Sequence, residues 1–417
     1  MLFSYILPGL VTFTGLYLLI RLRMFFVLHP LQASREFIDA ARDRESRRSL
    51  FLALAGTLGV GNIFGVCAGL LIGGPGVVFW LLFSSIFSSV IKYAETVLTF
   101  DFLNNDKGMS TVLFHVFKKY GKSVSFIYSS LTVLLALFMG AAMQSKAVND
   151  VAYFSLGLTP AISGILLLLF FLPCIIGGIR KIEAVTALLI PLTTIVYILM
   201  CFCVLLCNSS KIPGVIFQVF SCAFSPSSIV GGGVAIAIKE GFARGILSNE
   251  AGAGTSALAH SRAQGRSPHV AGLFAMSEVF FDTTLLCTLT ALTVLVSVDD
   301  LSRFSSPMAL IFNSFCSIFG DVGGYILLLL VLSFAYSTII CWYFYGMKCM
   351  SFIFPKHKTF FAVIFIGFLL FTSLISYEII IYLTDYLLFI MSVFTLAALI
   401  KKSSRIAQLS KNKGTDA

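Results

Sequence analysis

Charged side chains are scarce in this sequence. Of its 417 residues only 12% are Asp, Glu, Lys or Arg, whereas 58% are apolar and the mean hydropathy is +0.97. A soluble domain carries roughly 25% charged residues, so about half of the usual water-facing charge is missing. The composition excludes an ordinary soluble protein and predicts a chain whose surface faces lipid over much of its area.

Clusters of cysteine and histidine are missing as well. The ten Cys are scattered, mostly inside apolar runs and without a CxxC motif, and the five His lie in loops or at the ends of apolar runs. Such cysteines are best interpreted as small buried apolar residues. We therefore expect no disulfide and no structural metal site. An intramembrane enzyme is also disfavoured, because it would need a His-rich metal cluster or a Ser/His arrangement inside the apolar runs.

Continuous apolar runs indicate about eleven membrane-spanning helices. Helices satisfy their backbone polar groups within lipid, whereas a barrel would need alternating ten-residue strands. The fold is therefore predicted to be all-α, with a single membrane transport domain over 1–400 and a cytoplasmic tail over 401–417. The first run lacks a preceding positive region, so it is predicted to be a retained span. The predicted spans are 2–26, 50–73, 75–100, 124–147, 159–178, 184–207, 229–262, 269–297, 322–349, 359–375 and 379–400.

Lys and Arg are distributed unevenly between alternate loops. Of the 29 basic residues, 23 fall on loops of one side, and only Lys146, Lys211 and Arg303 fall on the other. The positive-inside rule places the basic side in the cytoplasm. This predicts a multi-pass plasma-membrane protein with its N-terminus outside and its C-terminus inside, and with a cytoplasmic amphipathic helix over 28–49. Because the positive charges alternate along the chain, they disfavour a nucleic-acid surface.

Two predicted spans contain residues that an ordinary membrane helix avoids. The second reads A-G-T-L-G-V-G-N-I-F-G-V-C-A-G over 55–69, and the seventh reads G-F-A-R-G-I-L-S-N-E-A-G-A-G-T-S over 241–256. Glycine costs a helix about 1 kcal/mol relative to alanine, and buried Arg, Asn and Glu cost more against lipid. Glycine also permits close helix packing, so either segment alone would be an ambiguous signal.

The positions of the two segments strengthen the prediction of breaks. Span 2 opens one group of five spans and span 7 opens a second, and an odd number of spans per group inverts the second group. Interrupted helices at matching positions of inverted halves indicate the midplane site of a transporter. A half-helix starting near Asn62 would present N–H groups to a carboxylate. Carbonyls near Gly59 and Val60 would face a cation, so the site suits a zwitterion beside a small cation.

Six motifs are spread along the chain. They are G-T-L-G-V-G-N-I-F-G-V, G-G-P-G-V-V-F-W (73–80), K-Y-A-E (92–95), R-G-I-L-S-N-E-A-G-A-G (244–254), F-D-T with T-A-L (within 281–292) and S-T-I-I-C-W-Y-F-Y-G (337–346). These motifs resemble the sodium:alanine/glycine symporter family, with similarity from about residue 10 to 390. This resemblance implies a leucine-transporter-like fold, in which helices 2–6 and 7–11 form inverted five-helix repeats after one extra N-terminal helix. It also implies uptake of alanine, glycine or similar amino acids driven by Na⁺, without an organic cofactor.

The same resemblance implies the binding residues. For four of these residues a structural role stays open. Ser337 and Thr338 could instead bond the carbonyl one turn back, Gln144 could be an interhelical hydrogen-bonding residue, and Trp342 could be an interfacial or packing aromatic. The implied substrate-binding residues are Gly61, Asn62, Gly65, Gln144, Ser248, Asn249 and Trp342, and the implied Na⁺-binding residues are Gly59, Asn62, Ser337 and Thr338.

Charged residues inside the predicted spans need partners, because a buried charge is costly in lipid. Asp282 either helps to hold the cation or neutralises Arg244 or Lys239, and we expect the structural pairing. Lys92 and Glu95 are three residues apart, so they are expected to form an ion pair at the cytoplasmic end of the third span.

Three places depart from the family pattern. Phe64 stands where the family commonly has Ala, residues 106–114 lack the usual G-G-P-M-Y-Y, and 391–396 read M-S-V-F-T-L with Thr395 where Asn is usual. These departures leave open a divergent member with a changed substrate or coupling ion. They also leave open a sensor or channel that keeps the transporter fold without active transport. The choice between Na⁺ and H⁺ and the oligomeric state are not determined by the sequence.

Overall fold

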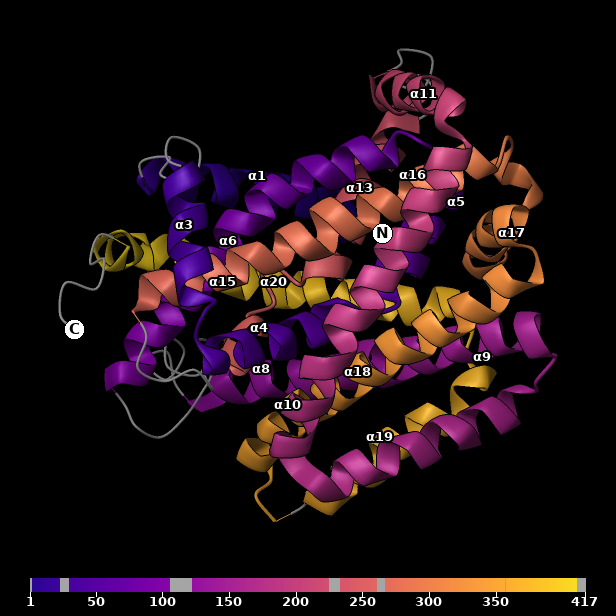
Figure 1. Cartoon of the computed structure of the whole chain (residues 1–417). Coiled ribbons are helices and arrows are strands. Elements are labelled where there is room, and N and C mark those ends of the chain that lie inside the picture. The colour runs from indigo at the N-terminus through magenta and orange to yellow at the C-terminus, as the bar shows by residue number, and fades with distance from the viewer. Residues whose placement is uncertain are drawn as a thin grey trace.

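The computed structural model of the chain describes residues 2–22, 30–105, 122–224, 233–260, 267–356 and 358–410. Every regular element in these ranges is a helix, which confirms the all-α prediction. The helices pack side by side into one bundle (Figure 1). Residues 106–114, which depart from the family pattern, lie outside the described ranges.

Six helical segments are long and apolar enough to cross a membrane, and a bent pair of helices makes a seventh. Exposed Leu, Ile and Phe side chains are numerous on the outside of the bundle, as contact with lipid requires. The six segments lie in α6 (Val77–Asn105), α8 (Lys122–Leu135) continued through η2 (Ala136–Met143) and α9 (Gln144–Leu156), the second part of α10 (Pro160–Cys207), α15 (Pro268–Val279) continued through η4 (Phe280–Cys287) and α16 (Thr288–Ser297), α18 (Asp321–Ile353) and α20 (Tyr377–Leu409).

Three further predicted spans coincide with shorter apolar helices. These are α1 (Leu2–Arg21), the first part of α10 and α19 (Lys358–Phe371). Gly178 separates the two parts of α10 with a φ of 62°, a conformation that glycine adopts without steric cost. It marks the predicted boundary between spans 5 and 6. The chain therefore has several candidate membrane crossings, whereas the number eleven stays a prediction.

Both glycine-rich segments interrupt their helices, as predicted. The first interruption separates α4 (Arg44–Thr57) from a π-helical turn, η1 (Gly61–Gly65), and from α5 (Val66–Gly73), with a bend of 48°. The second separates α13 (Gly233–Asn249) from the short α14 (Ser256–His260). We call these interruptions the first break (58–60) and the second break (250–255).

The two broken helices run in opposite directions. The half of the first helix before its break, α4, packs against α14, which follows the second break. The half after the first break, α5, packs against α13, which precedes the second break. Each break opens a run of helices, α4–α10 and α13–α20, so opposite directions at these two positions agree with inverted halves.

Two helices lie in segments that the hydropathy pattern assigns to loops. They are α11 (Ile212–Phe224) and α17 (Pro307–Phe319), and the side chain of Ser306 caps α17 by accepting a hydrogen bond from Ala309 N at 3.1 Å. The sequence S-P before an apolar run is a helix-start signal, so α17 could have been found. Short turns join other helices, namely η3 (Ser209–Lys211), η5 (Leu301–Arg303) and η6 (Thr372–Leu374).

The segment predicted as one amphipathic helix over 28–49 is instead divided. Its described part forms α3 (Pro30–Ala40) and the start of α4, because Asp43 caps a new helix by accepting from Ser46 N at 2.8 Å. At the chain's other end, α20 continues to Leu409, beyond the predicted boundary at 400. Arg21 donates to Ser404 Oγ at 2.7 Å, so α1 and α20 end on the same side of the bundle.

Candidate functional site

The first break exposes backbone carbonyls that α18 reaches. Trp342 Nε1 donates to the carbonyl of Gly56 at 3.2 Å, and Thr338 Oγ1 donates to that of Leu58 at 3.4 Å. The carbonyls of Gly59 and Val60, predicted to face a cation, accept bonds from backbone N–H groups of η1. One turn of α18 therefore holds the end of α4 in place by side-chain bonds.

Gln144, at the start of α9, holds the next residue of the break. Its Oε1 accepts from Val60 N at 3.2 Å, while its Nε2 donates to Met139 O at 3.1 Å. Gly59 lies so close that an added Cβ would be 2.8 Å from Thr338 Oγ1 and 3.2 Å from both polar atoms of the Gln144 amide. Gly59, Gln144 and Thr338 thus meet at the first break, as the predicted site requires.

The second break contains three residues with positive φ. These are Glu250 at 56°, Gly252 at 91° and Gly254 at 73°. Asn249, the last residue of α13, stabilises the turn by accepting from Ala251 N at 2.9 Å, and it donates to Thr283 Oγ1 at 3.0 Å. Glu250 is the only non-glycine residue with positive φ in the described chain, so the backbone of the turn is strained at this residue.

Asp282 connects the two breaks. Its Oδ1 accepts a short hydrogen bond from Asn62 Nδ2 beside the first break, and its Oδ2 accepts from Ser248 Oγ at 2.7 Å beside the second. The carboxylate is fully buried. The expected pairing of Asp282 with a basic residue is wrong, because Arg244 instead bonds Asp385 at 2.5 Å and lies 3.4 Å from Glu240, and Lys239 pairs with Glu240.

The donor set around Asp282 fits a small hard cation. Asp282 has no basic partner among the described residues, and Asn62 Oδ1 is buried without a hydrogen-bond partner. An anionic carboxylate, an amide oxygen and hydroxyl groups are the ligand types that hard cations prefer over nitrogen and sulfur. In the described chain no group of three or more His, Cys, Asp and Glu could hold a metal ion. The oxygen atoms around Asp282 therefore suit a cation held by a carboxylate, an amide and hydroxyl groups.

Aromatic and charged contacts cover the breaks on the side of α5 and α13. The ring of Phe64 is buried and lies 5.7 Å from that of Tyr377, at the start of α20. Nearby on α13, Arg244 pairs with Asp385 of α20. Phe64 therefore packs against the last helix, and α20 is tied to the second broken helix.

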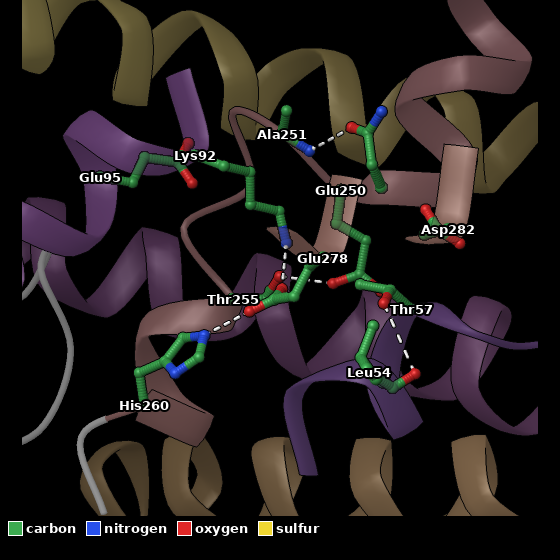
Figure 2. Close-up of polar contacts among 12 residues, drawn as sticks. Leu54, Thr57, Lys92, Glu95, Glu250, Ala251, Thr255, His260, Glu278 and Asp282 are labelled. Carbon is green, nitrogen blue, oxygen red and sulfur yellow. Dashed lines mark hydrogen bonds and ion pairs between the residues drawn. The ribbon is translucent and has the colours of Figure 1, made fainter. Parts of the chain in front are cut away.

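A group of buried ionisable residues lies beside the second break, on the side of α14 and away from α5 (Figure 2). Lys92 Nζ is 3.1 Å from Glu278 Oε2, and His260 also bonds Glu278. The predicted ion pair of Lys92 with Glu95 is wrong, since Glu95 accepts from Gly252 N at 2.7 Å. Proximity in sequence suggested the nearer glutamate, whereas the fold brings α15 to Lys92.

The structure brings together most of the predicted site residues, but not all of them. Ser337 Oγ donates to carbonyls of its own helix, at Ser333 and Phe334, so it does not contact the break. Trp342 is fully buried between Gly140 and the end of α4, which makes it a packing residue in this conformation. Asn62, Ser248 and Asn249 do gather at the breaks with Gly61 and Gly65, whose nearest neighbour is Leu247.

The sequence pattern did not reveal two features of the candidate site. These are the presence of Thr283 and the bonds by which Asp282 connects the two breaks. Thr283 Oγ1 accepts from Asn249 and lies 3.2 Å from Ser248 Oγ. Both residues belong to the F-D-T motif on η4, a π-helical turn. Such turns occur often at functional sites, so a polar pair within an apolar span was the available signal.

Known proteins are similar to this chain in sequence or in fold. The sodium/alanine symporter AgcS of Methanococcus maripaludis is 31% identical over 362 residues, which cover 82% of this chain and 77% of that protein. The probable sodium/glutamine symporter GlnT of Bacillus subtilis is 27% identical, covering 87% and 77%. The crystal structure of MhsT in complex with L-phenylalanine has a TM-score of 0.62 at 13% identity, covering 87% of this chain and 97% of that one.

A family model also matches the chain over a range that includes both breaks. The family model for the sodium:alanine symporter family matches residues 1–412. The motifs around the two breaks, the opposed broken helices and this match agree with one another. The chain therefore belongs to the sodium:alanine symporter family of membrane transporters.

Proposed function

We propose that this protein takes up small neutral amino acids such as alanine and glycine together with Na⁺ across the plasma membrane. The observation that carries the proposal is Asp282, a buried carboxylate without a basic partner in the described chain that bonds side chains beside both breaks. A cation bound there would stabilise the carboxylate and, through Asn62 and Ser248, fix both breaks in one arrangement. Binding of the ion would thereby prepare the substrate site.

The substrate would bind next to the first break through its zwitterionic backbone. The N-terminus of η1 and α5 presents backbone N–H groups and the positive end of the helix dipole to a carboxylate. In this proposal the backbone at Gly61 and Gly65 and the side chains of Asn62, Gln144, Ser248 and Asn249 would surround this position. A bound Na⁺ held by Asp282, Asn62, Thr338 and carbonyls of the first break would add electrostatic attraction for the carboxylate.

The side chain of the substrate is the least constrained feature. Relatives at comparable identity are named for alanine and for glutamine. Phe64, which replaces the usual Ala, belongs to η1, is buried and packs on Tyr377. In this proposal its ring would limit the room for the substrate side chain at the first break, which would favour alanine and glycine over glutamine. The predicted orientation, with the N-terminus outside and the C-terminus in the cytoplasm, remains part of this proposal.

The proposed function is tested by uptake into vesicles that contain the purified protein. Labelled alanine or glycine should accumulate above its external concentration only when Na⁺ is higher outside. An equal gradient of choline should give no accumulation. Absence of uptake of every small neutral amino acid under any cation gradient would refute the proposal and favour a sensor or channel with this fold.

The adjacent hydroxyls of α18 should behave differently. Thr338→Val removes the hydroxyl that reaches Leu58 O, whereas Ser337→Ala removes one that bonds only its own helix. Losing one such contact to an ion site costs about 1.5 kcal/mol, or about tenfold in affinity. We expect the Na⁺ concentration for half-maximal uptake to rise about tenfold in Thr338→Val and to change less than twofold in Ser337→Ala. Equal effects of both substitutions would contradict the assignment of Thr338.

Substrate size should depend on Phe64. In Phe64→Ala the ring that packs on Tyr377 is removed, which frees space beside η1. We expect competition by glutamine against labelled alanine to become about tenfold stronger, since a buried ring contributes a few kcal/mol of steric selection. Phe138→Ala is a suitable control, because that ring packs on Phe368 of α19. Unchanged selectivity in Phe64→Ala would show that this ring does not limit the substrate.

A further inference from the structure

Five ionisable side chains are buried together beside the second break, and none of them belongs to the proposed transport site. Lys92 and Glu95 belong to α6, Glu250 to the break, His260 to α14 and Glu278 to α15, and each is at most 1% exposed. Figure 2 shows Lys92, Glu278 and His260 in contact, with Glu95 on the far side of Lys92 from Asp282. By the predicted orientation they lie in the cytoplasmic half of the bundle.

The two basic residues of this cluster both contact the same carboxylate. Lys92 and His260 bond the two oxygens of Glu278. Glu95 and Glu250 form no ion pair in the described chain. Each has one bonded oxygen, because Glu95 Oε1 accepts from Gly252 N at 2.7 Å and Glu250 Oε2 accepts from Thr255 Oγ1 at 2.5 Å. Their other oxygens, Glu95 Oε2 and Glu250 Oε1, are buried and accept no hydrogen bond of good geometry in the part of the chain that the structure describes, although the N–H of Gly254 lies near the Glu95 carboxyl.

An ionised carboxylate in this position is unfavourable. Burial removes its hydration, the unpartnered oxygen receives no hydrogen bond in exchange, and Glu278 repels it. Lys92 attracts it, but the Lys92 ammonium bonds Glu278 and offsets these effects only in part. A proton on the unpartnered oxygen removes the charge and leaves the bonds to Gly252 and Thr255 intact. A metal ion fits poorly, because the Lys92 ammonium is close to the same carboxylates. A proton is therefore the ligand that suits these two side chains.

Both carboxyl groups are bonded to the break itself. Glu95 holds the backbone of Gly252, Glu250 holds Thr255, and Tyr128 of α8 donates to the carbonyl of Ala253. These bonds fix the segment that links α13 to α14. Opening of this half of the bundle would admit water, which hydrates carboxylates and stabilises their ionised form. The closed arrangement thus holds protons, and the opened one releases them.

We infer that Glu95 and Glu250 form a proton-binding site that keeps the cytoplasmic half of the second broken helix closed when it is protonated. On opening, the O–H bond of each carboxyl breaks and its proton passes to cytoplasmic water. On closing, the same carboxylate takes a proton back. Protons are bound and released on one side, so the site makes transport sensitive to cytoplasmic pH without moving protons across the membrane.

Other titratable groups face the cluster from neighbouring elements. Tyrosine and cysteine ordinarily titrate well above pH 7, so the neighbouring tyrosines and cysteines stay neutral over the range of the test. Asp282 belongs to the proposed cation site and is unchanged in the variants below. His260 bonds Glu278 and neither of the two proposed carboxyls, and it stays intact in the variants below. The neighbouring groups are Tyr128 on α8, Cys341, Tyr345 and Cys349 on α18, and Asp282 on η4.

Infrared spectroscopy of the purified protein tests proton binding directly. At neutral pH the wild-type protein should show the carbonyl band of protonated carboxyl groups, which shifts in D₂O. Glu95→Gln and Glu250→Gln should each lose part of this band, while Glu378→Gln, at an exposed position of α20, should not. Glutamine keeps the bonds to Gly252 and Thr255, so folding should be retained. An unchanged band in both variants would overturn the proposal.

Exchange of labelled alanine tests the consequence for transport. In right-side-out membrane vesicles the lumen pH is varied while the external pH is fixed. Wild-type exchange should rise with lumen pH, by up to about tenfold per pH unit for each proton that opening releases. Glu95→Gln and Glu250→Gln imitate the protonated form, so they should keep the low rate at every pH, and Glu378→Gln should follow the wild type. A wild-type pH profile in both glutamine variants would overturn the inference.

The two proposals can fail separately. If no amino acid exchanges in any vesicle, the proposed transport function is wrong, and the infrared comparison alone decides whether Glu95 and Glu250 bind protons. If exchange occurs and responds only to external pH, the transport function stands and the cytoplasmic proton site is refuted.

Discussion

Replacing Asp282 by asparagine should abolish Na⁺-driven uptake while leaving the fold intact. The asparagine side chain would keep an oxygen for Asn62 or Ser248 but would carry no charge, so the proposed cation site would lose its only anionic ligand. A unit charge 4 Å from a cation contributes about 4 kcal/mol at an effective dielectric constant of 20, which corresponds to about a thousandfold in affinity. We expect uptake of alanine at fixed Na⁺ to fall at least a hundredfold.

The matched control for this substitution is Asp321→Asn. Asp321 is an exposed residue in the first turn of α18. It is distant in sequence from both breaks and is not part of the proposed cation site. Its replacement should change uptake less than twofold. Both variants are compared by uptake and by thermal unfolding in detergent, so that loss of fold is recognised. If Asp282→Asn keeps the Na⁺ dependence of the wild type, Asp282 does not bind the coupling ion.

A single methyl group at Gly59 should disturb the first break. The added Cβ would lie 2.8 Å from Thr338 Oγ1 and 3.2 Å from the Gln144 amide, both closer than ordinary contact. Those side chains would have to move, which breaks their bonds to Leu58 O and Val60 N. We expect Gly59→Ala to lower the rate of Na⁺-driven uptake more than tenfold, since two bonds of about 1 kcal/mol each are lost.

Gly367→Ala provides the comparison for Gly59→Ala. Gly367 lies in α19, and a Cβ there would have no neighbour within 4 Å. Alanine also favours helices over glycine, so this variant should be at least as stable as the wild type and should transport normally. Both glycine variants are assayed for initial uptake rate at several Na⁺ concentrations. Equal activity of the two would show that close packing at Gly59 is not needed.

The breaks themselves were predictable because their cause is local. Clustered glycine and polar residues weaken a helix wherever they occur, and the interruptions fall within the predicted segments. The opposed packing of α4 with α14 and of α5 with α13 agrees with the prediction of inverted halves, which rests on counting spans. The helix α11 was missed because its segment is too short and too interrupted by Pro and Gly to resemble a span.

The partners of buried charges could not be predicted from spacing. Lys92 has a glutamate three residues away, yet it pairs with Glu278, which is 186 residues distant in sequence. Arg244 likewise pairs with Asp385, whereas Asp282 bonds side chains beside the two breaks. Local rules describe neighbours on one helix face, whereas the lowest-energy pairing of a buried charge depends on which helices the fold brings together.

Adjacent residues of α18 show why only one of the two predicted hydroxyl groups reaches the first break. Consecutive residues on a helix point about 100° apart, so Ser337 and Thr338 cannot both face the same carbonyl. Thr338 faces the first break, and Trp342, one turn later on the same face, bonds the end of α4. Thr395, where the family pattern has Asn, bonds the carbonyl of Met391 within α20.

Calorimetry of the purified protein tests the central claim most directly, namely that a cation held between the two breaks creates the amino-acid site. Alanine and glycine are titrated into the protein in Na⁺ and, separately, in choline at the same ionic strength. We predict saturable binding in Na⁺ and affinity at least tenfold lower in choline. Binding of equal affinity in both salts would contradict the account, because the substrate site would then exist without the ion.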